Sequence, residues 1–250
     1  MTLSAERPTL DEAYGAFAWA YDGALGKRFF RAARRLLTPL VARPPREKTH
    51  LDLACGTALA VEFFEKRGYR SVGIDASLPM LRAGRRRVRR LVAGDVRSLP
   101  LRGTFARITC LYDSLNHLQQ RDDLVAVFTE VRRLMNGDSL FLFDMNHPEI
   151  YPAVWGMKEP FIESGANFHL EIATKYSRPQ KHGHALVTGW ATLPNGQRAA
   201  IRETHEQRAW SRREITGALR AAGIAPIAID DFDPFTEGRV VKLVFTCRTA

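Results

Sequence analysis

Hydrophobic side chains between residues 10 and 40 recur at steps of three and four residues, which is the spacing of an amphipathic helix. Gly23 and Gly26 interrupt this pattern, so we expect them to divide the helix in two. The adjacent Pro44 and Pro45 end the segment, because proline is a poor continuation of a helix. The chain is therefore predicted to open with a helical section.

From residue 46 to residue 148, short apolar runs alternate with helix-like stretches. The predicted strands cover residues 50–54, 70–74, 90–93, 106–111 and 139–143. The predicted helices cover residues 59–66, 79–87 and 122–134. Strands separated by helices form βαβ units, which give a mostly parallel sheet with right-handed crossovers.

The pattern changes after Pro148. Residues 161–210 lose the helical period and alternate apolar with polar side chains, as half-buried strands do. The tripeptide Pro-Asn-Gly at 194–196 lies between two such runs and predicts a hairpin turn. We expect three or four antiparallel strands, which are too few to form an independent domain and should pack on the core as a lid.

The last forty residues return to the core pattern. Ser211 and Glu214 have the spacing of a capping box and predict a helix that ends at Gly223. Apolar runs at 224–229 and 239–247 fit an antiparallel hairpin at the edge of a parallel sheet. The predicted fold class is α/β with a seven-stranded sheet. Its parts are an N-terminal helical lid at 1–45, the core at 46–148 and 211–250, and an antiparallel β insertion at 149–210.

Length and composition limit the number of domains and the cellular locations that are expected for the protein. A chain of 250 residues suits one large α/β domain with an insertion. No apolar run approaches the length of a membrane span, and the first fifteen residues have no apolar segment of a secretory signal. Cys55, Cys110 and Cys247 lie far apart, which favours reduced thiols and a cytoplasmic location. His182 and His184 lack a third ligand nearby in the sequence, so no metal site is predicted.

The formal net charge is +10, and much of it comes from arginines in predicted helices. Two interpretations stay open at this point. The arginines form solvated helix faces, or they form a basic surface for nucleic acid or another anionic partner.

The turn at residues 49–58 is the centre of the predicted site. An apolar strand passes through Asp52 into small residues at Ala54, Gly56 and Ala58, and a helical pattern follows at once. Ligands of parallel α/β sheets bind outside the carboxyl ends of the strands, at turns of this kind. A buried turn that uses small residues only for packing is the alternative.

Acidic residues at the ends of later strands indicate the type of cofactor. Asp75 follows Gly56 by nineteen residues, close to the spacing of a carboxylate that binds the hydroxyls of a ribose. A cap on the next helix is its alternative role. The dinucleotide fingerprint fails, because Ala54 and Leu59 stand where glycines are needed, and the phosphate loop is absent. Asp95 is placed to accept a hydrogen bond from an adenine amino group. These residues favour an adenosine without a phosphate clamp.

Four segments together resemble the class I S-adenosylmethionine-dependent methyltransferases. They are D-L-A-C-G-T-A at 52–58, V-G-I-D-A-S at 72–77, G-D-V at 94–96 and C-L-Y-D-S-L-N-H-L at 110–118. The opening Y-x-x-F-A-x-x-Y-D at 14–22, the β insertion and E-x-H-x-Q-R-A-W-S at 203–211 resemble the small-molecule, glycine N-methyltransferase-like members. Ala58 departs from the pattern, since many members have glycine there. The resemblance implies a Rossmann-like, doubly wound fold, with S-adenosyl-L-methionine as cofactor and S-adenosyl-L-homocysteine as product.

The resemblance also implies roles for individual residues. The implied cofactor-binding residues are Tyr14, Tyr21, Asp52, Ala54, Gly56, Asp75, Ala76, Met80, Asp95, Val96, Leu111 and His117. Asn116, Asp144, His205 and Arg208 are candidates for contact with the methyl acceptor. An amine acceptor must be neutral to attack, so Asp113, Asp144 and His147 are candidate bases, and Asp113 and His147 are the predicted catalytic residues.

The predicted function is methyl transfer to a small molecule, by N- or O-methylation, with an amine slightly favoured. Methyl transfer needs alignment and exclusion of water more than a dedicated catalytic triad, which fits the absence of one. The alternatives are an RNA methyltransferase that uses the basic surface and a non-catalytic protein that binds S-adenosylmethionine. No membrane partner is expected, and the protein is expected to be a monomer or homodimer.

Overall fold

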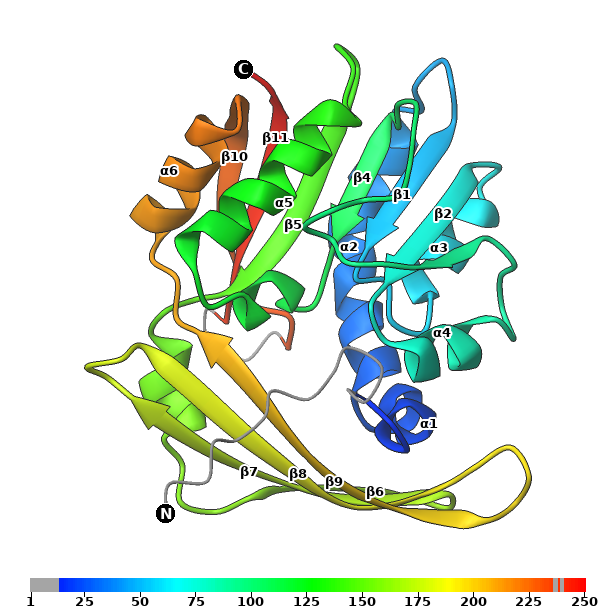
Figure 1. Cartoon of the computed structure of the whole chain (residues 1–250), viewed down its shortest axis with the longest axis vertical. Coiled ribbons are helices and arrows are strands. Elements are labelled where there is room, and N and C mark those ends of the chain that lie inside the picture. Colours follow the sequence, from blue (N-terminus) through cyan, green and yellow to red (C-terminus); the bar gives the residue numbers. More distant parts are fainter. Residues whose placement is uncertain (1–13, 236–237, 239–240) are drawn as a thin grey trace.

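A seven-stranded sheet forms the core of the computed structural model, which describes residues 14–235, 238 and 241–250 (Figure 1). Its strands are β1 (Thr49–Leu53), β2 (Arg70–Asp75), β3 (Leu91–Ala93), β4 (Arg107–Cys110), β5 (Leu140–Asn146), β10 (Ile224–Phe232) and β11 (Lys242–Thr249). They lie in the order β10-β11-β5-β4-β1-β2-β3. The first five pair in parallel, and β11 pairs antiparallel with both β5 and β10. The predicted sheet and its antiparallel edge are confirmed, with residues 239 and 240 of the last predicted strand outside the described residues.

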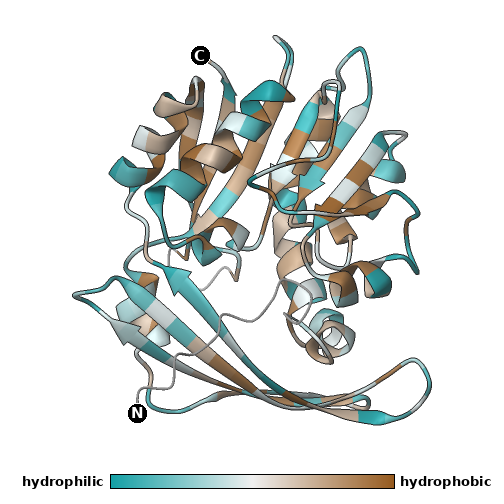
Figure 2. Ribbon diagram, viewed as in Figure 1, coloured by the Kyte–Doolittle hydropathy of each residue, from teal (hydrophilic) through white to brown (hydrophobic). Residues whose placement is uncertain are grey.

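Helices cover both faces of this sheet. The core helices are α3 (Leu59–Glu65), α4 (Leu78–Gly84), α5 (Arg121–Arg133) and α6 (Arg212–Ala221). In β5, Phe141 and Phe143 pack with α5 and α6, whereas Leu142 between them packs with the helices of the opposite face. Because successive side chains of a strand point to opposite faces, this run of apolar residues is buried on both sides. Figure 2 shows the result as apolar colour concentrated along the strands of the large sheet.

The N-terminal helical section is continuous, so the prediction of a break was wrong. It runs through α1 (Phe17–Tyr21), a π-helical turn η1 (Asp22–Gly26) and α2 (Lys27–Ala42). Gly23 serves close packing instead, because a Cβ added there would lie 2.5 Å from the ring of Phe168. Residues 10–13 of the predicted helix lie outside the described residues, and the helix ends before the two prolines as expected.

The insertion forms a separate four-stranded antiparallel sheet, as predicted. Its strands are β6 (Phe161–Gly165), β7 (Phe168–Ser177), β8 (His182–Thr192) and β9 (Arg198–Arg208), paired in that order. A short π-helical turn, η3 (Tyr151–Trp155), precedes it. The 194–196 turn joins β8 to β9, with Gly196 at φ +84°. Figure 1 shows this sheet crossing below the core, with α1 lying between the two.

Apolar side chains hold the insertion against the N-terminal helix. Leu170, Val187 and Ile201 of the small sheet form one buried cluster with Phe17 and Ala20 of α1. At the other end, Ser211 caps α6 through the predicted capping box with Glu214. Ile201 of β9 belongs to this buried cluster, and Arg208 at the end of β9 donates to Glu214 of α6 at 3.1 Å, so β9 is held at two points. No helix among the described residues is long and apolar enough to cross a membrane.

Candidate functional site

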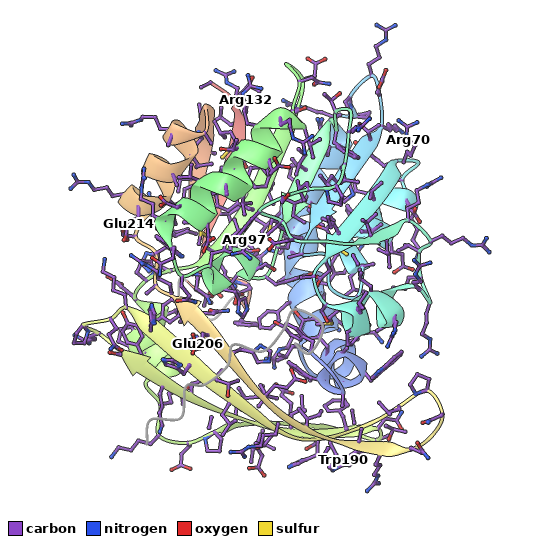
Figure 3. The ribbon with its side chains drawn as sticks, viewed as in Figure 1. Arg70, Arg97, Arg132, Trp190, Glu206 and Glu214 are labelled. Atoms are coloured by element: carbon purple, nitrogen blue, oxygen red, sulfur yellow. The ribbon has the colours of Figure 1, made fainter. Side chains whose placement is uncertain are left out.

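A pocket of about 880 Å³ lies at the carboxyl ends of β1, β2 and β4, between the core, the N-terminal helix and β9. All twelve residues predicted to bind the cofactor line it: Tyr14, Tyr21, Asp52, Ala54, Gly56, Asp75, Ala76, Met80, Asp95, Val96, Leu111 and His117. Of the predicted acceptor residues, His205 lines the pocket. The core contributes one wall, including Arg97, and β9 contributes the opposite wall, including Glu206 (both labelled in Figure 3).

The turn after β1 has an unusual backbone that opens toward this pocket. Ala54, Gly56 and Ala58 all have positive φ, at 49°, 52° and 65°. The conformation costs an alanine roughly 1–2 kcal/mol, so the surrounding structure must impose it. Hydrogen bonds from Cys55 N to Ile74 O and from Ala58 N to Cys55 O, at 2.9 and 2.8 Å, hold the turn in place. A Cβ on Gly56 would meet no atom within 4 Å, so the backbone there is open to a ligand.

Asp75 joins this turn to the end of β2. Its Oδ2 accepts a 2.7 Å hydrogen bond from Gly56 N, and its Oδ1 accepts a 2.8 Å bond from Ser77 N. Burial raises the pKa of Asp75, while these backbone donors act against the rise. A carboxylate has about four lone-pair sites, so two bonds leave capacity for the hydroxyls of a ribose. The residues around the turn therefore fit an adenosine-type cofactor.

Asp52 lies deeper in the same wall and belongs to a buried polar chain. Thr109 Oγ1 donates to Asp52 Oδ1 at 2.6 Å, and His50 Nε2 lies 2.9 Å from the same hydroxyl. Burial raises the pKa of Asp52 to about 7, with the Thr109 bond opposing the shift. The charge of Asp52 therefore changes near neutral pH.

At the adenine end of the predicted site, Asp95 is already paired. Its carboxylate accepts hydrogen bonds from the backbone N–H and the guanidinium of Arg97, at 2.6–3.0 Å. Arg97 also bonds Asp123 Oδ1 at 3.0 Å, and its bonds to Asp95 lower the pKa of that carboxyl. Sequence reasoning missed Arg97 and Asp123, both of which line the pocket. The position of an arginine two residues after Asp95 is the one local feature of the sequence that could have indicated this pairing.

Two tyrosines cover the pocket from the N-terminal section. The rings of Tyr14 and Tyr21 meet edge to face, with centroids 6.1 Å apart. Tyr14 has φ +64°, and its N–H donates a 2.9 Å hydrogen bond to Glu203 Oε2. Its ring lies 4.7 Å from that of His205. Tyr14 therefore connects the N-terminal section with β9 across the pocket.

A second contact that sequence reasoning missed ties the N-terminal section to the turn. Asp22 accepts a 2.6 Å hydrogen bond from Thr57 Oγ1 and forms an ion pair with Arg87. Arg87 also donates to Thr57 O at 3.2 Å. Asp22 is the last residue of the 14–22 motif, but the sequence carried no sign of Arg87 as its partner.

The histidines of the pocket gather at the β9 wall. His205 Nε2 lies 3.4 Å from Glu203 Oε2, and both side chains are largely buried, at 12% and 15% exposure. The ring of His117 lies 6.1 Å from that of His205. Burial lowers the pKa of His117 to about 4, so this imidazole is neutral at pH 7. The site thus holds a neutral imidazole beside a histidine–carboxylate pair.

Asp113 and Asp144 lie outside the lining of the pocket, in a buried ionic cluster. Lys242 of β11 pairs with Asp113 and lies 3.2 Å from Asp144 Oδ2. Asp144 also accepts the backbone N–H groups of Tyr112 and Asp113, at 2.6 and 3.1 Å. Burial acts to lower the pKa of Lys242, but the two carboxylates outweigh it and raise the pKa. No pattern in the sequence indicates Lys242 as a partner, because it is 129 residues from Asp113.

The remaining predicted residues, Asn116, Arg208 and His147, are not among the residues that line the pocket and make internal contacts. Asn116 donates to Arg208 O and accepts from Asn146 N, at 2.8 and 2.9 Å. Arg208 donates to Gln119 O and Glu214, at 2.8 and 3.1 Å. His147 Nδ1 accepts from Glu149 N at 3.3 Å. These placements indicate that Asn116 and Arg208 join the core to the insertion, and a catalytic role for His147 stays a prediction.

Comparisons with known proteins agree with this geometry. A methyltransferase-domain family model matches residues 51–138. The dTDP-3-amino-3,6-dideoxy-alpha-D-glucopyranose N,N-dimethyltransferase of Streptomyces fradiae is 25% identical over 228 residues, or 84% of each chain. The demethylmenaquinone methyltransferase of Corynebacterium kroppenstedtii is 35% identical over 130 residues, so the match spans 51% of this chain and about half (53%) of that relative.

A solved structure gives the same fold. The S-adenosylmethionine-bound amino pentose methyltransferase CalS10 of Micromonospora echinaspora is 20% identical with a TM-score of 0.72, covering 96% of this chain and 99% of that one. The fold, the pocket and the matching domain are those of an S-adenosylmethionine-dependent methyltransferase. Among the methyltransferases that it resembles are enzymes named for amino sugars.

Proposed function

We propose that the protein transfers a methyl group from S-adenosylmethionine to an amine of a small molecule, with amino sugars as the acceptor class. The charge of the pocket carries this proposal. Six carboxyl side chains line it: Asp52, Asp75, Asp95, Asp123, Glu203 and Glu206. Arg97 and Arg202 are the arginines among the same lining residues. An acidic pocket favours a cationic cofactor and an amine over a phosphate-rich strand.

The cofactor half of the proposal rests on the turn and the strand ends. Asp75 would hold the ribose, and Asp95, Val96 and Met80 would surround the adenine. Asp52, Ala54 and Gly56 would receive the methionine part, since the backbone there is open to the pocket. When bound, S-adenosylmethionine supplies an activated methyl group on a sulfonium centre. The protein then has to orient the acceptor, exclude water and manage one proton.

The acceptor half is assigned to the β9 wall. An ammonium must lose a proton before its nitrogen can attack. His205, held by Glu203, and the neutral His117 are the imidazoles that line the pocket beside Tyr14. We assign the proton acceptor to His205, because a pKa of about 4 makes His117 a weak base at pH 7. The position of His205 in the lining supports it over Asp113 and His147, which make contacts elsewhere.

The insertion and the N-terminal section would serve as the walls that confine a small acceptor. Residues 202–206 of β9 and two tyrosines line the pocket opposite the cofactor turn, which supports the lid role for both segments. The amine preference draws on the Streptomyces fradiae and CalS10 enzymes, whose names specify amino sugars.

The test is a panel of nucleotide-linked and free amino sugars, each matched with its hydroxyl analogue. Formation of S-adenosylhomocysteine is followed by mass spectrometry. Turnover of an amino sugar but not of its hydroxyl analogue is the expected result. Methylation of RNA in place of every small amine would overturn the proposal. Tight cofactor binding without turnover of any panel member would favour a non-catalytic role.

A further inference from the structure

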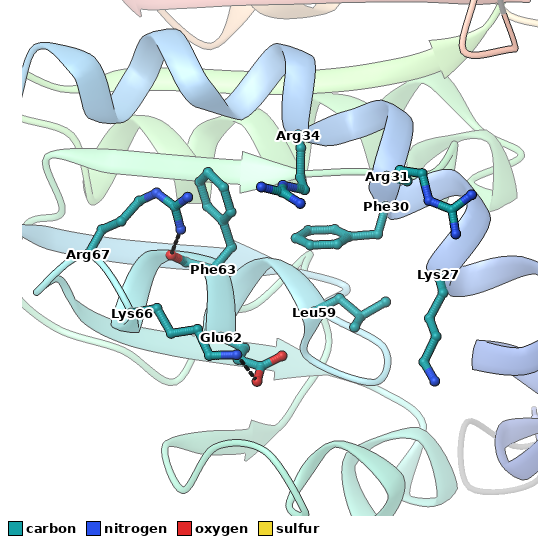
Figure 4. A pocket seen from close by; sticks show the side chains of 9 residues that line it. All are labelled: Lys27, Phe30, Arg31, Arg34, Leu59, Glu62, Phe63, Lys66 and Arg67. Carbon is teal, nitrogen blue, oxygen red and sulfur yellow. Dashed lines mark hydrogen bonds and ion pairs between the residues drawn. The ribbon is translucent and has the colours of Figure 1, made fainter.

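A second hollow of about 370 Å³ lies between α2 and α3, away from the strand ends (Figure 4). Its lining residues are Lys27, Phe30, Arg31, Arg34, Leu59, Glu62, Phe63, Lys66 and Arg67. Five of these are cations and one is an acid, the opposite balance to the main pocket. Leu59 at the start of α3 borders both hollows.

The cations on α2 lie on one side of the helix. Lys27, Arg31 and Arg34 have the spacing i, i+4, i+7, which places them on a single face. Figure 4 shows all three along the side of α2 that faces α3. None of them forms an ion pair with a carboxylate in the part of the chain that the structure describes. Like charges at this spacing repel one another, so an anion between them would relieve a repulsion present in the free protein.

The two cations on the α3 side are already engaged. Lys66 Nζ pairs with Glu62 at 2.6 Å. The Arg67 guanidinium donates to Phe63 O at 2.9 Å and lies 3.6 Å from the centre of the Phe63 ring. The charge available to a ligand is therefore concentrated on α2, and Arg67 already covers one face of Phe63.

The floor of the hollow is apolar and aromatic. Phe30 is half-buried and meets Phe63 edge to face, with ring centroids 6.1 Å apart. Leu59 lies beside them at the start of α3. Arginines bind phosphate through paired N–H donors, and planar bases stack on aromatic rings. The volume falls in the range of sites for small ligands.

We propose that this hollow binds a phosphate monoester joined to a planar ring, as in a nucleotide. Arg31 and Arg34 hold the phosphate, Lys27 adds a third positive charge, and the Phe30 ring supports the base. The ligand is either a free nucleotide or the end of a single strand of nucleic acid, since both present this chemistry. The site is separate from the methyl-transfer pocket and stands whether or not the proposed function holds.

The test is calorimetric titration with uridine 5′-monophosphate, inorganic phosphate and uridine. S-adenosylhomocysteine is present in excess so that the main pocket is filled. We expect saturable binding of the nucleotide, tighter than that of phosphate or uridine alone. The double variant Arg31→Ala/Arg34→Ala should bind the nucleotide about 10-fold more weakly or worse, because paired phosphate contacts are lost. A matched double variant, Arg82→Ala/Arg86→Ala, removes two exposed arginines outside both hollows and should bind normally.

Two further arms complete the test. Phe30→Leu should reduce nucleotide affinity to that of phosphate and leave phosphate binding unchanged. If an oligouridylate of ten nucleotides binds more tightly than the mononucleotide, the site is assigned to nucleic acid. Equal or weaker binding of the oligonucleotide assigns the site to a free nucleotide. No saturable heat at millimolar nucleotide, or an equal loss in the Arg82/Arg86 control, would overturn the proposal.

Discussion

The hydroxyl of Thr57 donates a 2.6 Å hydrogen bond to Oδ1 of Asp22, and this bond joins the cofactor turn to the N-terminal helical section. Arg87 binds the other oxygen of Asp22 and the carbonyl of Thr57. The turn and the section that carries Tyr21 are thereby fixed to each other. Closure over the cofactor and the shape of the turn should therefore depend on one carboxylate.

Replacing that carboxylate should weaken cofactor binding. Asp22→Asn removes the charge that Arg87 binds at this joint, leaves Arg87 only the longer 3.8 Å pair with Glu62, and weakens the bond to Thr57. We expect affinity for S-adenosylmethionine to fall about 10-fold, because a hydrogen bond to a charged group contributes roughly 1.5–3 kcal/mol. Calorimetry measures the affinity, and amide hydrogen exchange over residues 17–26 should become faster. Glu65→Gln, which breaks an exposed pair with Arg90, is the control. An unchanged affinity would refute this dependence.

The ribose assignment predicts a larger loss at Asp75. Asp75→Ala removes both proposed bonds to the ribose and both bonds that the turn now makes to Gly56 and Ser77. We expect S-adenosylmethionine affinity to fall about 100-fold or more, from two lost bonds to a charged acceptor. Asp230→Ala, an exposed acid outside the pocket, should bind normally. If Asp75→Ala kept its affinity for S-adenosylmethionine and an intact fold by circular dichroism, Asp75 would stabilise only the turn and would not bind the ribose.

Asp52 should make the stability of the free protein depend on pH. Its folded-state pKa of about 7 is above that of an unfolded aspartate, so the folded state binds the extra proton between those values. This contribution to stability is present at pH 5 and is lost as pH rises through 7. Relative to Asp52→Asn, the wild type should lose roughly 2–3 kcal/mol of folding stability between pH 5 and pH 8. Urea unfolding at both pH values measures the difference. If the free energy of unfolding changed with pH by the same amount in both proteins, the raised pKa of Asp52 would be contradicted.

The buried lysine should be important for stability. Lys242→Met leaves the buried Asp144 and the half-buried Asp113 without their cation, which should cost about 3–5 kcal/mol at pH 7. The cost should shrink at pH 5, because burial already raises the pKa of Asp144 and loss of the lysine raises it further, so protonation relieves the charge. Urea unfolding gives both values. Lys175→Met, at an exposed position on β7, should change stability by less than about 0.5 kcal/mol.

The proton acceptor can be tested by comparing two histidines. His205→Asn should lower kcat/KM for an amine acceptor about 100-fold, the usual scale of general-base catalysis, with little change in S-adenosylmethionine affinity. His147→Asn should leave both quantities unchanged, because His147 lies outside the pocket lining. A loss of kcat/KM in His147→Asn and none in His205→Asn would instead support the sequence-based prediction that His147 is a catalytic base.

Local patterns were sufficient to predict most of the architecture. The switch from helical period to alternation marked the insertion, and the Pro-Asn-Gly turn at 194–196 and the Ser211 capping box were confirmed. The spacing of Gly56 and Asp75 also predicted two residues of one pocket. These features follow from sequence because each depends on neighbouring residues or on strand ends that a parallel sheet brings together.

The alternation of strands and helices, the cofactor turn and the acids at the strand ends can all be recognised in the amino-acid sequence. The folded structure adds the pairing of charges: it brings Arg87 to Asp22 across 65 residues and Lys242 to Asp113 across 129. It also packed Phe168 against Gly23, where the sequence suggested a break, and left His147 outside the pocket. The periodicity of helices and strands depends on residues that are close in the sequence, whereas the partner of a buried charge depends on which distant segments pack together.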